Sequence, residues 1–114
     1  MELKTRKIYE EEWEPWIGEG YGNASSLMMV NRTDSTSVSC RIIKLKTEGH
    51  TEMHTHDRVH HVIMLDGVAE IETFNENVVL NHLVAIEVPP NVPHRFINNN
   101  DKEALILVLN IYKN

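Results

Sequence analysis

The sequence predicts an all-β fold in which short strands close into a barrel or sandwich. Helical periodicity is almost absent, and from Ser26 onward short apolar and β-branched runs alternate with turn residues at the spacing typical of such folds. The 114 residues are enough for one hydrophobic core. We therefore expect one β-barrel domain, residues 26–114, preceded by an extended arm and a glycine-rich loop, residues 1–25.

The predicted arm contains two tryptophans, Trp13 and Trp16, in an acidic stretch rich in glycine and proline. Glycine and proline at this density oppose a stable helix, so we expect extended chain and a loop. Two tryptophans in so polar a stretch need a surface to pack against. They either cover the open end of the chain's own barrel or contribute to a subunit interface, where tryptophan is enriched.

The predicted strands are short runs bounded by polar turn residues. The dipeptide Asp66-Gly67, between the third and fourth runs, is a strong hairpin signal because both central residues must accept a positive φ. The runs are Ser26–Asn31, Ser37–Lys46, His60–Leu65, Val68–Phe74, Asn77–Leu80, Leu83–Val88, His94–Asn98 and Ala104–Tyr112.

Charge and composition argue against several classes of protein. A formal charge of -6 disfavours a nucleic-acid partner, which requires a basic face. The longest apolar run, Ala104–Leu109, is far shorter than the roughly 20 residues that span a bilayer, so we expect no membrane association. No secretory signal opens the sequence and Cys40 has no partner for a disulfide, so we expect a cytoplasmic protein.

Four histidines have a spacing that suits a metal site. His54 and His56 are two residues apart and share one face of a strand, His60 has the same parity, and His94 follows the rigid turn 89–93. Neutral imidazole is the commonest metal ligand. We expect one divalent transition metal ion, of Mn, Fe, Ni, Cu, Zn or Co, bound by these four side chains. The alternative is a pH-sensitive histidine cluster.

The same residues resemble the first conserved motif of the cupin superfamily, G(X)5HXH(X)3-4E(X)6G. His54-x-His56, then three residues, then His60, then six residues, then Gly67 reproduces its spacing. The motif glutamate is replaced by His60, and Gly49 lies one residue after the position of the first motif glycine. A metal ion with four neutral ligands would keep its full positive charge, which favours anionic ligands.

The second cupin motif, G(X)5PXG(X)2H(X)3N, is matched by Pro89-x-Asn91-x-x-His94-x-x-x-Asn98. Leu83 and Asn91 stand where this motif has glycines. Asparagine tolerates a left-handed backbone, whereas Leu83 predicts a different turn. The resemblance implies a double-stranded β-helix, or jelly roll, with two antiparallel sheets around a central metal-containing cavity.

Strand parity predicts the apolar lining of this cavity and the outer partners of the ligands. Glu52, Asp57 and Arg58 are candidates to accept or donate hydrogen bonds around the metal-bound imidazoles. The predicted lining residues are Cys40, Ile42, Val62, Met64 and Phe96.

The resemblance leaves several functions open, because cupins include dioxygenases, isomerases, epimerases, lyases and binding proteins. The leading hypothesis is a metal-dependent enzyme that acts on a small, anionic molecule, with dioxygenase-like oxidoreductase chemistry. The alternatives are a redox-neutral isomerase or hydrolase, and a non-catalytic module that binds a small ligand. Short sheet edges and the arm predict a homodimer.

Overall fold

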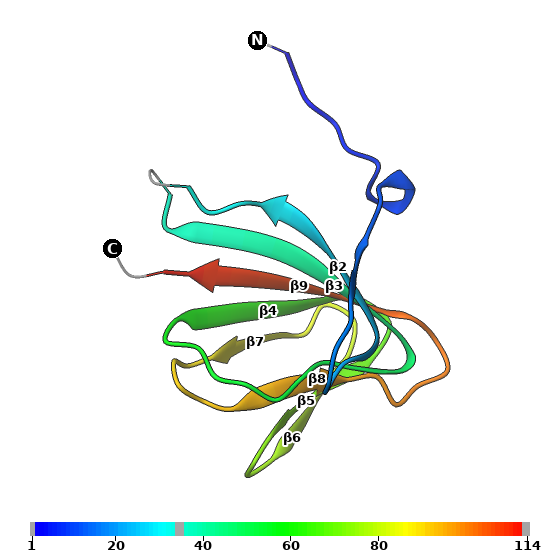
Figure 1. The fold of residues 1–114 in the computed structure, drawn as a ribbon, viewed down its shortest axis with the longest axis vertical. Helices are drawn as coiled ribbons and strands as arrows, with labels where there is room; N and C mark the ends of the chain where they lie inside the picture. The colour runs from blue at the N-terminus through cyan, green and yellow to red at the C-terminus, as the bar shows by residue number, and fades with distance from the viewer. Residues whose placement is uncertain (1, 34–35, 113–114) are drawn as a thin grey trace.

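One long, bent strand, β3 (Val38–His50), belongs to both walls of an antiparallel barrel (Figure 1). The computed structural model describes residues 2–33 and 36–112. Most of β3 pairs with β9 (Ala104–Ile111), whereas its last residue, His50, pairs with Ile97 of β8 (His94–Ile97). The two predicted sheets are therefore two walls of one sheet, and the all-β, jelly-roll prediction is confirmed.

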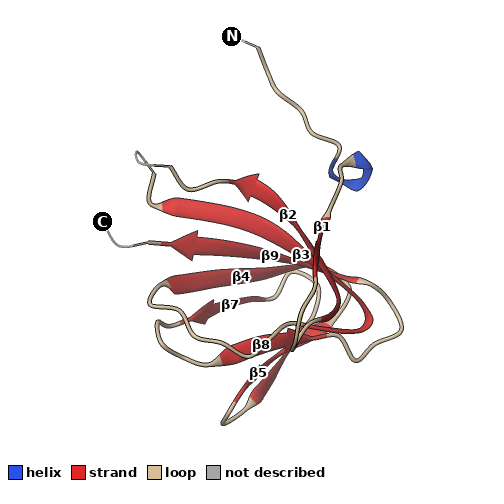
Figure 2. Ribbon diagram, viewed as in Figure 1, coloured by secondary structure: helices blue, strands red, loops and turns tan. Residues whose placement is uncertain are grey.

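The remaining strands follow β3 on either side, in the order β6-β5-β8-β3-β9-β4-β7. Figure 2 shows that strands and loops make up nearly the whole described chain. The one helix in these ranges is a three-residue 3-10 turn, far too short to cross a membrane. The other elements are η1 (Ile8–Glu10), β1 (Glu14–Trp16), β2 (Gly22–Val30), β4 (Val59–Asp66), β5 (Ala69–Thr73), β6 (Asn77–Leu80) and β7 (Ala85–Val88).

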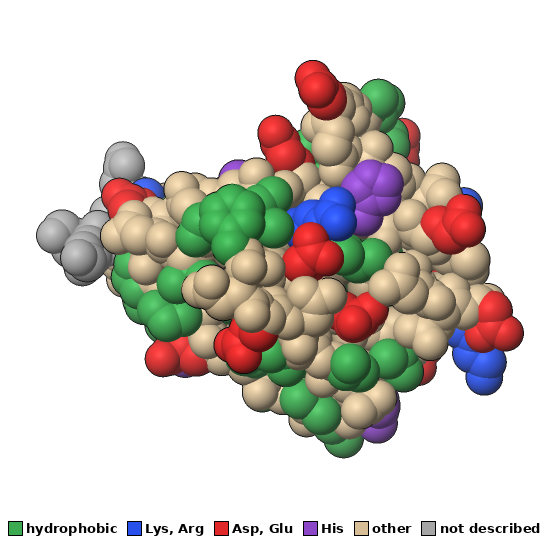
Figure 3. All heavy atoms as spheres, turned by 90° about the horizontal axis from the view of Figure 1, so that it is seen from below, with side chains coloured by type: hydrophobic (Ala, Val, Ile, Leu, Met, Phe, Trp, Pro, Cys, Tyr) green, Lys and Arg blue, Asp and Glu red, His purple; other side chains and the backbone are tan. Residues whose placement is uncertain are grey.

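The core lies between the walls and consists of every second residue of the strands. On the central strand β9, Ala104, Ile106 and Val108 point inward and are at most 6% exposed. Of the outward-facing residues between them, Leu107 and Leu109 are half-buried and Leu105 is buried. The predicted homodimer remains a prediction. On the face drawn in Figure 3, acidic and apolar side chains are mixed and basic ones do not gather into a patch.

The Asp66-Gly67 turn is not the predicted hairpin. β4 pairs with β7 and β9, whereas β5 pairs with β6 and β8, so the chain crosses from one wall to the other at this turn. Gly67 has a φ of +77° and lies close to the backbone of Glu103. A Cβ added at this position would lie 2.5 Å from the carbonyl oxygen of Glu103. The glycine is therefore needed for a close approach at the corner as well as for a turn.

Three left-handed residues occupy the glycine positions of the two cupin motifs. Glu48, Leu83 and Asn91 have φ values of +64°, +63° and +65°. The structure thus corrects the prediction of a different turn at Leu83, since the backbone there is left-handed as a glycine would be. The Leu83 amide donates a hydrogen bond to the carbonyl of Met64 at 2.8 Å, which holds the turn against β4. Its side chain is 68% exposed, so little packing offsets the strain.

Replacing Leu83 with glycine should increase stability. The substitution removes the steric cost of a left-handed Leu, partly offset by the greater freedom of glycine in the unfolded chain, for a net gain of about 0.5–1 kcal/mol. The free energy of unfolding in urea measures the gain. The neighbouring Val84→Gly variant is the control, because Val84 is not among the positive-φ residues and should lose stability. Equal losses of stability in the two variants would contradict the inference that the left-handed backbone of Leu83 is strained.

Candidate metal centre

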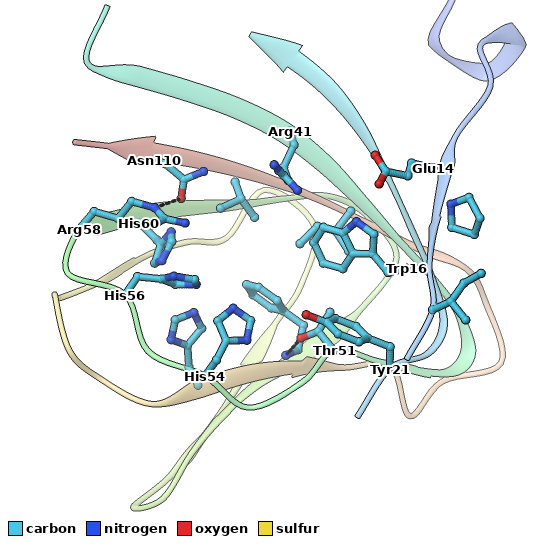
Figure 4. A pocket seen from close by; sticks show the side chains of 16 residues that line it. Glu14, Trp16, Tyr21, Arg41, Thr51, His54, His56, Arg58, His60 and Asn110 are labelled. Carbon is cyan, nitrogen blue, oxygen red and sulfur yellow. Dashed lines mark hydrogen bonds between the residues drawn. The ribbon is translucent and has the colours of Figure 1, made fainter. Parts of the chain in front are cut away.

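A cavity of about 410 Å³ lies between the walls, and histidines line one side of it (Figure 4). His54 and His56 come from the loop between β3 and β4, His60 from β4 and His94 from β8. Strand pairing brings the separate segments together, because His54 and His94 form an isolated antiparallel bridge with two backbone hydrogen bonds of 3.2 Å. All four predicted histidines therefore face the same cavity.

The histidine rings are packed closely enough to share an ion. Nitrogen atoms of His56, His60 and His94 all lie within 4.8 Å of one another. Two nitrogens bound to one metal at about 2.1 Å are at most about 4.2 Å apart, so a small contraction would complete the site. The ring of His54 lies 4.4 Å from that of His56 and 5.9 Å from that of His94, measured between centroids. Three histidines can thus hold an ion, and the fourth ligand remains a prediction.

Backbone carbonyls orient two of the rings. The Nδ1 atoms of His54 and His94 lie 2.8 Å from the carbonyl oxygens of Glu52 and Val92, respectively. A carbonyl oxygen only accepts, so each Nδ1 carries the proton and each Nε2 keeps its lone pair. These contacts replace the predicted side-chain partners: Glu52 contributes its carbonyl rather than its carboxylate. The arrangement prepares both Nε2 atoms to bind a metal.

His60 gives a further indication of a metal. Its side chain is 4% exposed, yet neither ring nitrogen makes a well-formed hydrogen bond, although the Asn110 side chain is close enough to raise its pKa; no other buried side chain in the described ranges is in this state. Buried polar atoms without partners are costly and rare. A metal ion would satisfy the lone pair of this imidazole. The donor set therefore fits a divalent transition metal ion.

The surroundings keep these imidazoles neutral. Burial, followed by the charge of Arg58, lowers the pKa of His56 to about 3. Burial and the neighbouring His94 and Arg58 lower the pKa of His60 to about 4. Burial also lowers the pKa of His94, against the opposing effect of its hydrogen bond to Val92. A pH switch near the usual histidine pKa is therefore less well supported than a metal site.

The apolar lining differs from the prediction. Phe96 lines the cavity, but on β3 the lining residues are Arg41 and Ile43, so Cys40 and Ile42 lie on the opposite face of the strand. Both faces of β3 carry apolar residues, so the apolar pattern alone does not identify which face of this strand points into the cavity. Val62 and Met64 have the inward parity but are 0% exposed, which places them in the closed core rather than along the cavity.

Residues of the N-terminal arm complete the cavity. β1 pairs with β2, with Trp16 opposite Ala24, and this pairing places Glu14 and Trp16 in the cavity wall with Tyr21. The rings of Trp16 and Tyr21 meet edge to face at 5.7 Å. Trp16 thus covers the chain's own barrel, one of the two alternatives considered above. The sequence indicated that the tryptophan needed a partner but not that the arm adds a strand.

Trp13 packs elsewhere. Its indole N–H donates to the carbonyl of Ile8 at 3.1 Å, and the Lys44 ammonium lies 4.0 Å from its ring centroid. Lys44 has the outward parity of β3, so Trp13 lies against the outer surface of the barrel.

The cavity also contains acid–base and cationic groups, of which only Arg58 was expected near the imidazoles. Burial, assisted by Glu52, raises the pKa of Tyr21, so its hydroxyl stays protonated. Glu14 is the one acidic side chain among the described lining residues. Arg58 donates from Nε to Oδ1 of the buried Asn110 at 3.3 Å, and Asn110 in turn donates to Ser39.

Comparison with known proteins agrees with this architecture. A family described as "Cupin domain" matches residues 41–110, more than half of the chain. No curated protein sequence matches the chain. Among solved structures, the polyketide cyclase RemF of Streptomyces resistomycificus is 16% identical, with a TM-score of 0.84 over 98% of this chain and 81% of that chain.

Two further structures show the same fold. A cupin-2 domain protein of Rhodospirillum rubrum is 13% identical, with a TM-score of 0.80 over 99% of this chain and 76% of that chain. A sugar phosphate isomerase of the cupin superfamily from Silicibacter pomeroyi is 15% identical, with a TM-score of 0.77 over 96% of this chain and 76% of that chain. At these identities the likeness establishes the fold alone.

The metal-free protein should lose stability as the pH falls from about 6.5 to about 4. His56 and His60 stay neutral in the folded state, with pKa values of about 3 and 4, whereas in the unfolded chain they protonate near pH 6.5. The unfolded state therefore binds more protons in this window and is favoured by acid. Urea midpoints in EDTA measure the loss. Replacing His60 with Gln should reduce the change of the urea midpoint with pH. An unchanged slope of midpoint against pH in H60Q would contradict the role assigned to His60.

Proposed function

The chain belongs to the cupin domain family, and from this premise we propose that it is a metal-dependent enzyme acting on a small organic anion. The observation that carries the proposal is the buried, unpartnered imidazole of His60 beside His56 and His94 on the wall of a cavity of about 410 Å³. His54 is proposed as the fourth ligand. A cavity of this size suits a small molecule.

The proposed ion would supply Lewis acidity, which polarises an oxygen of the substrate. The histidines contribute by staying neutral, so that the ion is not partly neutralised by its own ligands. The carbonyls of Glu52 and Val92 hold the rings of His54 and His94, respectively. This limits reorganisation of these two rings when a ligand binds.

The cavity favours a redox-neutral reaction that moves protons. Glu14 can accept a proton from a bound molecule, and the protonated hydroxyl of Tyr21 can donate a hydrogen bond or a proton. Both groups lie in the cavity wall with the histidines (Figure 4). Isomerisation and cyclisation need this combination of polarised oxygen, acid and base. The names of two structural neighbours, a polyketide cyclase and a sugar phosphate isomerase, are of this chemical kind.

An oxygen-dependent, dioxygenase-like reaction is the second candidate. It is favoured by the number of ligands, because an ion held by His54, His56, His60 and His94 would have room for a substrate and a further ligand. A non-catalytic binding module is the third candidate, and it would need only the ion and the cavity.

Replacing His60 with Ala should abolish tight metal binding. Loss of a direct ligand should weaken affinity by more than the roughly 10- to 100-fold typical of losing an outer partner. Calorimetry with Zn²⁺ and Co²⁺, with metal analysis after dialysis, measures this. His61→Ala is the matched control, because His61 faces outward, 3.6 Å from Glu87, and should bind metal as wild type. Unaltered binding in H60A would contradict the proposed centre.

Turnover should require metal and proceed at the same rate with and without oxygen. The measurement is product formation from enolisable keto acids and sugar phosphates by protein loaded with each candidate metal, in air and under nitrogen. Glu14→Gln should slow turnover by about 100-fold if Glu14 transfers a proton. A strict oxygen requirement would select the dioxygenase-like reaction instead, and tight binding without product would select the binding module.

A further inference from the structure

Two arginines share the cavity with the histidines. Arg41 comes from β3, where its inward position lies opposite Val108 of β9, and Arg58 comes from the loop just before β4. Figure 4 shows Arg58 beside His60 and Arg41 between Asn110 and Trp16. Both side chains are half-buried. The cavity therefore has one cation close to the proposed metal and another farther along the wall.

Neither guanidinium has an acidic partner in residues 2–33 and 36–112, where the arginine ion pairs are Arg6–Glu11 and Arg95–Glu72. Arg58 instead contacts the neutral amide of Asn110 and lies 5.0 Å from the centroid of the Tyr112 ring. Such partners orient a guanidinium without neutralising it and leave most of its N–H donors available.

Arg41 is held in a similar way. Its guanidinium carbon lies 5.5 Å from the centroid of the Trp16 ring, an aromatic contact that leaves its positive charge unneutralised. Glu14 is the one carboxylate among the described lining residues, and it is exposed. In a chain with a formal charge of -6, this concentration of positive charge in one cavity favours an anionic ligand.

The remaining walls indicate which kind of anion fits. Ile43, Phe96, Trp16 and Val108 make much of the lining apolar or aromatic. Apart from the histidines, two buried polar side chains line the cavity and both are engaged: Thr51 Oγ1 accepts from the Phe96 amide at 2.9 Å, and Asn110 is bonded at both its oxygen and its nitrogen. Few groups remain to bind the hydroxyls of a sugar. A flat, apolar body is the better match.

We infer that Arg41 and Arg58 form an anion-recognition pair and that the substrate is an aromatic or conjugated carboxylate. The planar guanidinium of Arg41 binds the carboxylate through paired hydrogen bonds, and the ring system packs against Trp16 and Phe96. Arg58 binds oxygen on the side of the histidines. This inference rests on the proposed function, since it names the substrate class of the same site.

The test is equilibrium binding rather than turnover. The probes are benzoate, cinnamate and salicylate, the neutral amide benzamide, inorganic phosphate and glucose 6-phosphate, each titrated calorimetrically into metal-free and Zn²⁺-loaded protein. Wild type should bind the aromatic carboxylates more tightly than benzamide or either phosphate. Arg41→Gln should weaken the carboxylates by about 10- to 100-fold, as expected for charged hydrogen bonds, and leave benzamide unchanged.

Matched variants separate recognition from folding. Arg32→Gln is the control for Arg58→Gln, because the exposed Arg32 has its guanidinium carbon 4.1 Å from the centroid of the same Tyr112 ring. This variant loses the same charge and should bind every probe as wild type. Arg41→Lys keeps the charge but loses the planar fork, so it should lose part of the carboxylate affinity. Arg58→Gln should weaken the carboxylates as well. Melting temperatures check that each variant is folded.

Some results would overturn the inference. These are unchanged carboxylate affinity in R41Q and R58Q, an equal loss for benzamide, or tighter binding of the phosphates than of the carboxylates. Metal content measured on the same samples distinguishes this failure from failure of the proposed function. If Zn²⁺ does not bind while the Arg41-dependent preference persists in the metal-free protein, the metal proposal fails and the anion pair stands.

Discussion

The candidate site depends on the antiparallel contact between the segment before β4 and the start of β8. The two hydrogen bonds between the backbones of His54 and His94 hold the loop that follows β3 against the start of β8. The bend of β3 makes this contact possible, because the strand leaves β9 and ends against β8. The ring of His94 thereby lies 5.2 Å from that of His60 on β4, and burial keeps the imidazoles of His56 and His60 neutral by lowering their pKa values.

The charge distribution of the cavity follows from the same geometry. The β3–β4 loop, β4 and β8 contribute the imidazoles, β3 and the same loop contribute arginines without acidic partners in the described residues, and the arm contributes the acidic Glu14. Cationic groups held by neutral partners repel one another more strongly when water is excluded. A bound anion relieves that repulsion. The cavity is therefore better suited to a charged ligand than its apolar walls alone would indicate.

The local chemistry of the site could be predicted from sequence better than its surroundings. Histidine spacing and the turn before His94 predicted that four imidazole rings face one cavity, and all four line it. Arg41 was missed because both faces of β3 carry apolar residues, so parity could not be assigned. The turn at Asp66-Gly67 was predicted as a hairpin, because this dipeptide favours a tight turn in a hairpin and at a corner alike. Only the pairing of β4 with β9 and of β5 with β8 distinguishes the two. Glu48, Leu83 and Asn91 show that a motif glycine encodes a dihedral angle that other residues can adopt.

The three-residue strand β1 has a consequence for how this protein could diversify. It contributes Glu14 and Trp16 to the cavity, yet β2 is its one pairing partner among the described strands. The imidazoles come from other elements, so the arm can exchange residues while the ligand set is preserved. Glu14 and Trp16 are thereby encoded in a stretch of the chain separate from the imidazoles, whereas Arg58 lies between His56 and His60. Selection acting on one stretch leaves the other intact, and grafting a different arm onto this barrel would be a direct route to a new specificity.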